Sequence, residues 1–202
     1  MKTKAATRLT LTTAMPQLVE SQDFGLGTPQ INKALRTGFL ADPSYKEIRF
    51  AGTKFGSVTY GKGEISLFLT HKERISYFVQ LTKTKVPGLG TESVTQTAVW
   101  RALGLAPSGI THKVFAAIIT KYGSVVSDSR QTEDGRKFWS GRLIEFFTLG
   151  HKVGFLANQS LIYVDSEEDL NEYFDSQGLK YPWGRSEHYA NFRFVIFKEK
   201  RQ

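Results

Sequence analysis

The sequence predicts an α+β fold with a mixed sheet, in which an antiparallel meander is followed by alternating helices and strands. Two observations carry this prediction. Between residues 46 and 101 the chain alternates apolar and polar residues or is rich in β-branched and aromatic types, as strands are. After residue 104 the apolar residues recur at helical spacing, interrupted by short apolar runs. A block of strands followed by mixed helices and strands is typical of α+β proteins.

Length and composition are sufficient for a full core. The chain has 202 residues, of which 40% are hydrophobic and 13% aromatic. Residues 1–45 are punctuated by Thr, Gly and Pro and are weakly periodic, so we expect a partly ordered N-terminal arm with one short helix near residues 30–37. Residues 46–202 are then expected to form a single α/β domain.

The meander is expected to contain strands over residues 47–51, 56–60, 64–70 and 74–84. Residues 61–63 and 70–73 fit hairpin turns, and residues 86–90 (Val-Pro-Gly-Leu-Gly) fit another turn. Residues 93–101 alternate well enough to form a further strand, although part of this segment also tolerates a helix.

The second half is expected to begin with a helix over residues 110–122, a short buried strand over 124–127 and a helix over 133–149. Trp139 and Leu143 lie on the apolar face of the second helix and are expected in the core. Strands are expected over 151–157 and 161–164. Ser166 opens a short helix with capping-box-like spacing to Asp169. Residues 191–197 alternate and predict a closing strand with one buried face.

The charge balance favours an anionic partner. The chain has 27 Lys and Arg against 19 Asp and Glu, a formal net charge of +8, with a basic N-terminal arm. Such a surface suits nucleic acid, an anionic membrane or an acidic ligand such as a nucleotide cofactor, and solubility alone explains it equally well. No apolar run is long enough to span a bilayer or resembles a signal peptide, so we expect a cytoplasmic protein without a membrane partner.

Several chemistries have no support in the sequence. The absence of cysteine excludes disulfides, thiolate nucleophiles and Cys-based metal sites. The four histidines are scattered and show no metal-ligand spacing. There is no Walker-type loop, nucleophile elbow or zinc-finger pattern.

The order of strand 93–101, glycine-containing loop, helix, strand, helix and closing strands resembles the GNAT superfamily of N-acetyltransferases. The family loop reads Arg/Gln-x-x-Gly-x-Gly/Ala. In this chain Gly109 matches the first glycine, whereas Ala106 and Thr111 stand at the other two positions. Residues 85–90 fit the glycine spacing better but precede no expected helix, so they are the second choice.

A second feature carries the resemblance to GNAT-like proteins that bacteriophages encode. After the strand over 124–127, the chain has Ser127-Asp128, then Gln131-Thr132, then Gly135 and Trp139. The likeness covers about residues 46–164.

The resemblance implies that acetyl-CoA is the cofactor. Its pyrophosphate would be held by the backbone N–H groups and the hydroxyl groups at the start of the helix, because free amides and the positive end of the helix dipole attract phosphate. The strand before the loop would pair with the pantetheine arm. The cofactor-binding residues expected on this basis are Val99, Trp100, Ser108, Gly109, Ile110 and Thr111. Without a cofactor, Trp100 is a cross-strand packing residue and the loop is an ordinary Pro/Gly turn.

The catalytic residues expected on the same basis are Asp128, Ser127 and Tyr163. Asp128 or Ser127 would place or deprotonate the amine, and Tyr163 would protonate the departing thiolate. Asp128 would equally serve as a helix cap. The resulting hypothesis is an acyl-CoA-dependent N-acyltransferase acting on an amine of a macromolecular or anionic substrate. The alternative is a non-catalytic module that binds nucleic acid or a host protein, for which residues 191–198 interleave basic and aromatic side chains.

Overall fold

The chain has an α+β architecture in the computed structural model, which describes residues 26–90, 92–128, 133–157, 160–170 and 193–198. These residues form nine strands of a mostly antiparallel sheet, in the order β1-β2-β3-β4-β5-β6-β9-β7-β8. The helices are α2 (Pro29–Leu40), α3 (Ile110–Tyr122) and α4 (Glu133–Thr148), with a one-turn 3-10 helix at Gly61–Gly63. The strands are β1 (Lys46–Phe50), β2 (Thr53–Thr59), β3 (Glu64–His71), β4 (Arg74–Thr84), β5 (Ser93–Arg101), β6 (Ser124–Ser127), β7 (Lys152–Ala157), β8 (Ser160–Val164) and β9 (Arg193–Phe197).

The chain divides into two compact units, which are described separately. Unit 1 takes the described residues up to 82 together with residues 96–117, and unit 2 takes residues 83–95 together with those from 118 onward. The strands β4 and β5 and the helix α3 therefore each contribute residues to both units.

Unit 1 is built from strands that follow one another along the chain. Hairpins join β1 to β2, β2 to β3 and β3 to β4, all antiparallel. The β3–β4 turn contains Lys72 and Glu73 at positive φ (46° and 63°), a conformation that non-glycine residues adopt uncommonly. The sequence predicted this turn, and it predicted β4 with the bounds that the structure gives. Pairing between strands that are close in the sequence costs little chain entropy, because the connecting loops are short.

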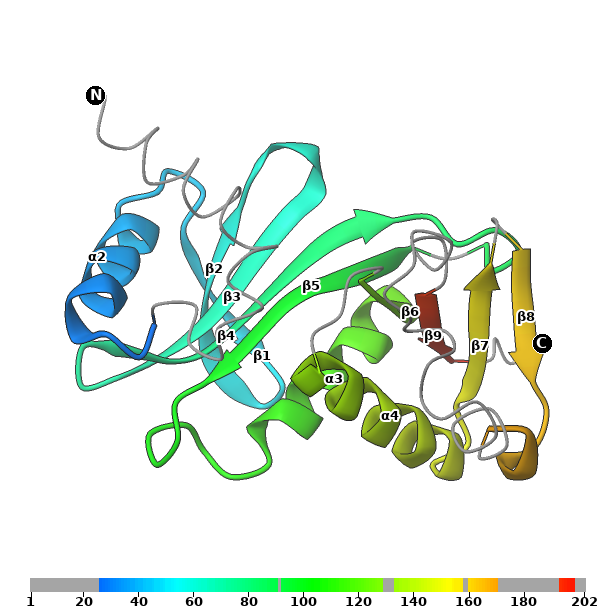
Figure 1. Ribbon diagram of the computed structural model, residues 1–202. Coiled ribbons are helices and arrows are strands. Elements are labelled where there is room, and N and C mark those ends of the chain that lie inside the picture. The colour runs from blue at the N-terminus through cyan, green and yellow to red at the C-terminus, as the bar shows by residue number, and fades with distance from the viewer. Residues whose placement is uncertain (1–25, 91, 129–132, 158–159, 171–192, 199–202) are drawn as a thin grey trace. The chain divides into compact units, whose positions relative to one another are not determined.

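Helix α2 covers one face of the unit 1 sheet (Figure 1). Its Leu35 and Phe39 join a buried cluster with Val58, Phe68, Ile75, Phe78, Ala98 and Trp100. The Phe39 ring stacks on Phe68 and Phe78, with centroids 4.9 and 5.9 Å apart. The predicted short helix near residues 30–37 is confirmed and extends by a few residues. Its apolar stripe completes the core of unit 1.

A buried amide ties α2 to the sheet. Asn32 is fully buried, and its Nδ2 donates to the backbone carbonyls of Leu26 and Ile75, both at 2.9 Å. Its Oδ1 accepts the Ile75 N–H at 2.7 Å. Every one of these bonds joins the helix side chain to backbone groups, so the amide replaces a missing strand neighbour at the start of β4. A buried amide without such partners would be costly.

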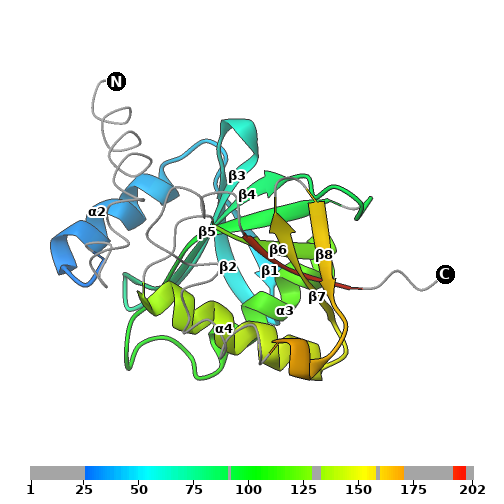
Figure 2. The same cartoon turned by 45° about the vertical axis from the view of Figure 1, so that its right-hand side comes forward.

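Unit 2 is built from segments far apart in the sequence. Strand β9 pairs antiparallel with both β6 and β7, and β7 also pairs with β8. Helix α4 lies against this group at β7 and β9 (Figures 1 and 2). Its buried residues include Trp139, Leu143 and Phe146, which are at most 1% exposed. The predicted core role of Trp139 and Leu143 is confirmed.

Strand β9 corrects one expectation. The alternation of residues 191–197 predicted one buried face, but Phe194, Val195, Ile196 and Phe197 are all buried, on both faces of the strand. The reason is that β9 lies inside the sheet, between β6 and β7, and is covered on both sides. Its aromatic rings are therefore core residues and offer no surface on which bases could stack. Asn191 and Phe192 lie outside the described residues.

Two smaller predictions also hold. Ser166 caps a short helical turn at residues 167–170, because its Oγ accepts the Asp169 N–H at 3.0 Å. The segment 93–101 is a strand, β5, with the predicted bounds and without the helix that its second half would tolerate. No helix within the ranges that the structure covers combines the length and the apolar character needed to cross a membrane.

Candidate functional site

The predicted cofactor-binding residues lie in unit 1, on β5 and at the start of α3. Val99 is half-buried near the end of β5, and Trp100, which is 9% exposed, belongs to the buried cluster beneath α2. The Trp100 side chain is thus a packing residue, as its alternative interpretation predicted. At this end of β5 the backbone and the half-buried Val99 side chain remain accessible to a ligand.

The loop between β5 and α3 presents backbone groups at a helix start. Ser108 and Gly109 are exposed, and Gly109 has a φ of 69° with open space where a Cβ would stand. The Gly109 carbonyl accepts the Lys113 N–H at 3.1 Å, which begins the hydrogen bonding of α3. Ile110 is buried at 2% exposure, so only its backbone faces outward, and Thr111 is half-buried.

The electrostatics of this helix start suit an anion. The first amides of an α-helix have no acceptor within the helix, and they carry the positive end of its dipole. The first turn of α3 contains no acidic residue. Four of the predicted residues, Ser108, Gly109, Ile110 and Thr111, therefore lie together at this helix start. The Ile110 N–H already donates to the Pro107 carbonyl at 3.3 Å, so a phosphate group would approach the other backbone N–H groups of the first turn. The competing segment, residues 85–90, leads into strand β5 instead of a helix.

The predicted catalytic residues lie in unit 2. Ser127 is the last residue of β6 and is fully buried, and its Oγ accepts the Phe194 N–H at 2.9 Å. This bond extends the β6–β9 pairing by one residue through a side chain. Ser127 thereby has a structural function that the sequence did not indicate.

Asp128 follows Ser127 directly and is half-buried at the end of β6. The two residues are brought together by their adjacency at this strand end. The segment that would decide whether Asp128 caps α4, residues 129–132 with Gln131 and Thr132, lies outside the described residues.

Tyr163 is separated from this pair. It lies on β8, with 51% of its surface exposed, and its ring packs edge-on against Phe197 at 5.7 Å between centroids. In the strand order, β9 and β7 lie between β6 and β8. At about 4.8 Å per strand, this places Tyr163 roughly 14 Å from the β6 strand. The structure therefore brings Ser127 and Asp128 together but not Tyr163.

Metal chemistry finds no support in the described ranges. These ranges contain no group of three or more His, Cys, Asp or Glu side chains placed to hold an ion. His151, at the start of β7, packs against the Phe146 ring at 5.2 Å between centroids. Burial lowers the pKa of His151, and the nearby Lys198 lowers it further.

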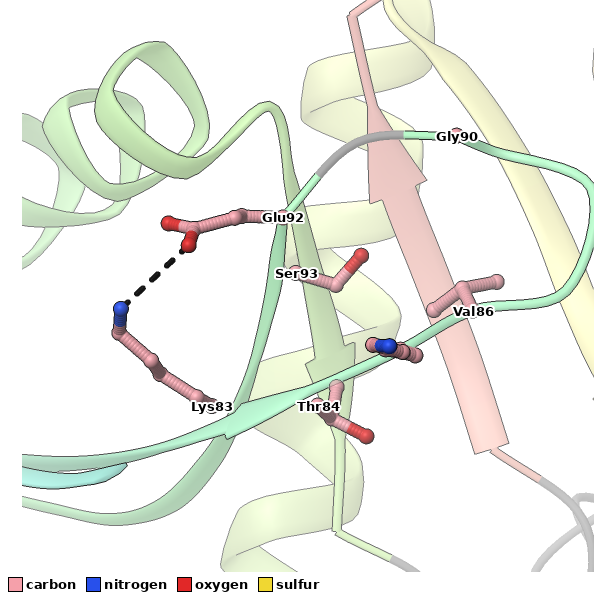
Figure 3. A pocket seen from close by; sticks show the side chains of 7 residues that line it. Lys83, Thr84, Val86, Gly90, Glu92 and Ser93 are labelled. Atoms are coloured by element: carbon pink, nitrogen blue, oxygen red, sulfur yellow. Dashed lines mark hydrogen bonds and ion pairs between the residues drawn. The ribbon is translucent and has the colours of Figure 1, made fainter. Parts of the chain in front are cut away.

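One feature escaped the sequence analysis. The end of β4 and the start of β5 line a pocket of about 580 Å³ in unit 2 (Figure 3). The sequence marked this segment only as a turn and as a second glycine-spacing match. The signal that could have revealed it is the pair of lysines, Lys83 and Lys85, directly before the apolar Val86 at the start of that turn.

Comparison with known proteins yields no match, either among protein-family models or among curated proteins. The functional assignment therefore depends on the geometry and chemistry of the chain itself.

Proposed function

We propose that the chain is a GNAT-like acyltransferase that uses acyl-CoA to acylate an amine. One observation carries the proposal. The chain runs β5, glycine loop, α3, β6, α4 and β7, and the closing strand β9 is inserted between β6 and β7. This order supports the GNAT likeness more specifically than an α+β class does. In the same proposal the protein is phage-encoded and acts in the host cytoplasm on a macromolecular or otherwise anionic substrate.

The residues at the start of α3 fit the phosphate groups of such a cofactor. Gly109 leaves open space at the loop, Ser108 adds an exposed hydroxyl, and no acid opposes the helix dipole. The cofactor would supply the activated acyl group. Thr111 and the backbone of Val99 would orient the cofactor. Trp100 would hold β5 in place through its packing in the buried cluster.

The residues at the end of β6 fit the handling of an amine. Asp128 would accept a proton from the amine or hold it in place, since a half-buried carboxylate at a strand end can do either. Ser127 would act by holding β6 and β9 together beneath it. Tyr163 is the proton donor in the proposal, and in the strand order its strand β8 is separated from β6 by β9 and β7.

A non-catalytic binding module is the second candidate. The observation that favours it is the replacement of two signature positions of the family loop by Ala106 and Thr111. The net charge of +8 makes nucleic acid or an acidic region of a host protein the fitting partner.

Thermal unfolding with and without acetyl-CoA tests the first candidate. A ligand that binds only the native state raises the Tm, by about 5–10 °C at roughly a hundred times its Kd. Gly109→Glu should abolish this rise, because it places a carboxylate at the helix start. Gly104→Glu is the matched control: Gly104 has a similar φ (75° against 69°) and equally open surroundings, so the backbone strain is alike.

Asp128→Asn separates binding from catalysis. It should keep the acetyl-CoA-induced rise in Tm while lowering acetyl transfer to a model amine by about a hundredfold or more. A wild-type Tm that stays unchanged at millimolar acetyl-CoA contradicts the acyltransferase. A steep salt dependence of DNA or RNA binding together with that result would favour the binding module.

A further inference from the structure

A second candidate site lies in unit 2, where β4 and β5 join. The pocket there, called the hairpin pocket below, has a volume of about 580 Å³, within the range of small-molecule sites. Its lining residues are Lys83, Thr84, Lys85, Val86, Gly90, Glu92 and Ser93. None of them belongs to the proposed cofactor or amine sites.

The apolar part of the hairpin pocket is fixed by the core of unit 2. Val86 is 5% exposed and packs in a cluster with Val126, Val195 and Phe197. Leu89, half-buried in the same loop, packs against this cluster. A ligand with an apolar body would therefore contact side chains that β6 and β9 hold in place, instead of a mobile surface loop.

A buried hydroxyl pair supplies a hydrogen-bond donor. The Oγ atoms of Ser93 and Ser124 lie 2.5 Å apart, and both side chains are at most 1% exposed. Two hydroxyls carry two protons, and their mutual bond uses one. Within the residues that the structure describes, the second proton has no acceptor. Ser93 lines the pocket whereas Ser124 does not, so the arrangement in which Ser124 donates to Ser93 leaves the Ser93 proton available to a ligand.

Of the two lysines of the pocket, one has no ion pair within the described part of the chain. Lys83 forms an ion pair with Glu92 at 3.4 Å, and Figure 3 shows these two side chains directed toward each other, with Ser93 directed away from them. Lys85 forms no ion pair with any acid in the described part of the chain. The lining thus carries a net positive charge, two lysines against one glutamate, next to an unused hydroxyl donor.

We propose that the hairpin pocket binds a small carboxylate ligand with a short apolar body. The carboxylate oxygens would accept hydrogen bonds from the Ser93 hydroxyl and the Lys85 ammonium, and the apolar body would lie on Val86, which Leu89 supports from the core cluster. Charge-assisted hydrogen bonds of this type are the stronger ones, so they set the orientation of the ligand. The site stands at the start of β6, at the opposite end of that strand from Ser127 and Asp128, and does not depend on the acyltransferase proposal.

Titration of the isotope-labelled full chain with hexanoate, followed by NMR amide shifts, tests this site. We expect saturable shifts confined to residues 84–93 and the start of β6. 1-Hexanol, which has the same apolar body without the charge, should bind about tenfold more weakly, because it lacks the charge-assisted bonds. Inorganic phosphate should cause no saturable shift, because it lacks the apolar body.

Matched variants identify the contacts. Lys85→Met and Ser93→Ala should each weaken hexanoate binding by about fivefold to tenfold, whereas Lys152→Met, at an exposed lysine of the same unit, should leave it unchanged. Ser93→Ala could disturb β5, so the amide spectrum of this variant outside the pocket is compared with that of the wild type. If that spectrum changes, the affinity of Lys85→Met for hexanoate decides the test. The proposal is overturned if millimolar hexanoate causes no saturable shift, if Lys85→Met leaves the affinity for hexanoate unchanged, or if phosphate causes equally strong shifts.

Discussion

The two units solve the same packing problem with opposite chain topologies. Unit 1 pairs strands that are neighbours in the sequence, and one side chain of its covering helix α2, Asn32, makes three buried hydrogen bonds. Unit 2 pairs β6 with β9, which are far apart in the sequence, and its polar links are single hydroxyl bonds at Ser127 and Ser93.

This difference indicates which substitutions should destabilise each unit most. In unit 1 the loss of a single amide removes three buried hydrogen bonds at once, because all three involve the Asn32 side chain. In unit 2 each polar link contributes one bond, and the strand pairing and the apolar core of β9 carry the rest. We therefore expect the loss of one polar side chain to lower the free energy of unfolding more in unit 1 than in unit 2.

Asn32→Asp should produce the largest effect. It removes both Nδ2 donors from the Leu26 and Ile75 carbonyls and places a carboxyl group against them in a fully buried position. We expect a loss of about 3 kcal/mol or more in the free energy of unfolding, measured by urea denaturation. Gln30→Glu, the same exchange at an exposed position of α2, is the control and should be nearly neutral. Hydrogen exchange should accelerate first at the amides of β3 and β4; equal acceleration in β9 would break the contrast between the units.

Ser127→Ala should have an intermediate effect. It leaves the buried Phe194 N–H without its acceptor and should cost about 1–2 kcal/mol, with faster hydrogen exchange at Phe194. Ser160→Ala, at an exposed position on β8, is the control. Unchanged stability together with a loss of acetyl transfer would instead assign Ser127 to the chemistry and not to the link between β6 and β9.

Lys198→Met should have the smallest effect, on the pH dependence of unit 2. The pKa of His151 is lowered in the folded chain, so its contribution to stability is complete above the unfolded pKa near 6.5 and is lost as the pH falls toward the folded pKa. Removing the Lys198 charge should raise the pKa of His151 toward its ordinary value and weaken the acid sensitivity. NMR titration of the His151 ring measures this, with Lys121→Met as the control. If the pKa of His151 does not change in Lys198→Met, the Lys198 charge does not contribute and burial alone lowers this pKa.

Much of the fold could be predicted because local patterns determine it. The alternation of residues 74–84 and 93–101 and the helical spacing of 110–122 gave element bounds that the structure repeats. The two-sided burial of β9 could not be predicted, because the order of strands in a sheet is not encoded by the period of one strand. Asn32 reads as a surface residue in sequence, and its partner Ile75 lies 43 positions away.

The candidate site was predictable to a lesser degree. The helix start at Gly109 follows from loop and helix patterns, so the four residues of the loop were found together. The bond from Phe194 to Ser127 spans 67 positions and leaves no trace in either segment. The hairpin pocket was missed for a similar reason, since the hydroxyl pair of Ser93 and Ser124 joins residues 31 positions apart.

The central place of β9 also has a consequence for synthesis of the chain. It follows β6 by more than sixty residues, and ribosomes add roughly 5–20 residues per second. For several seconds β6 and β7 are therefore both made while the strand that joins them is still missing. During that interval Val126, Val153 and Phe155 lack their native cover, and the nascent chain offers chaperones an apolar target that the finished protein conceals.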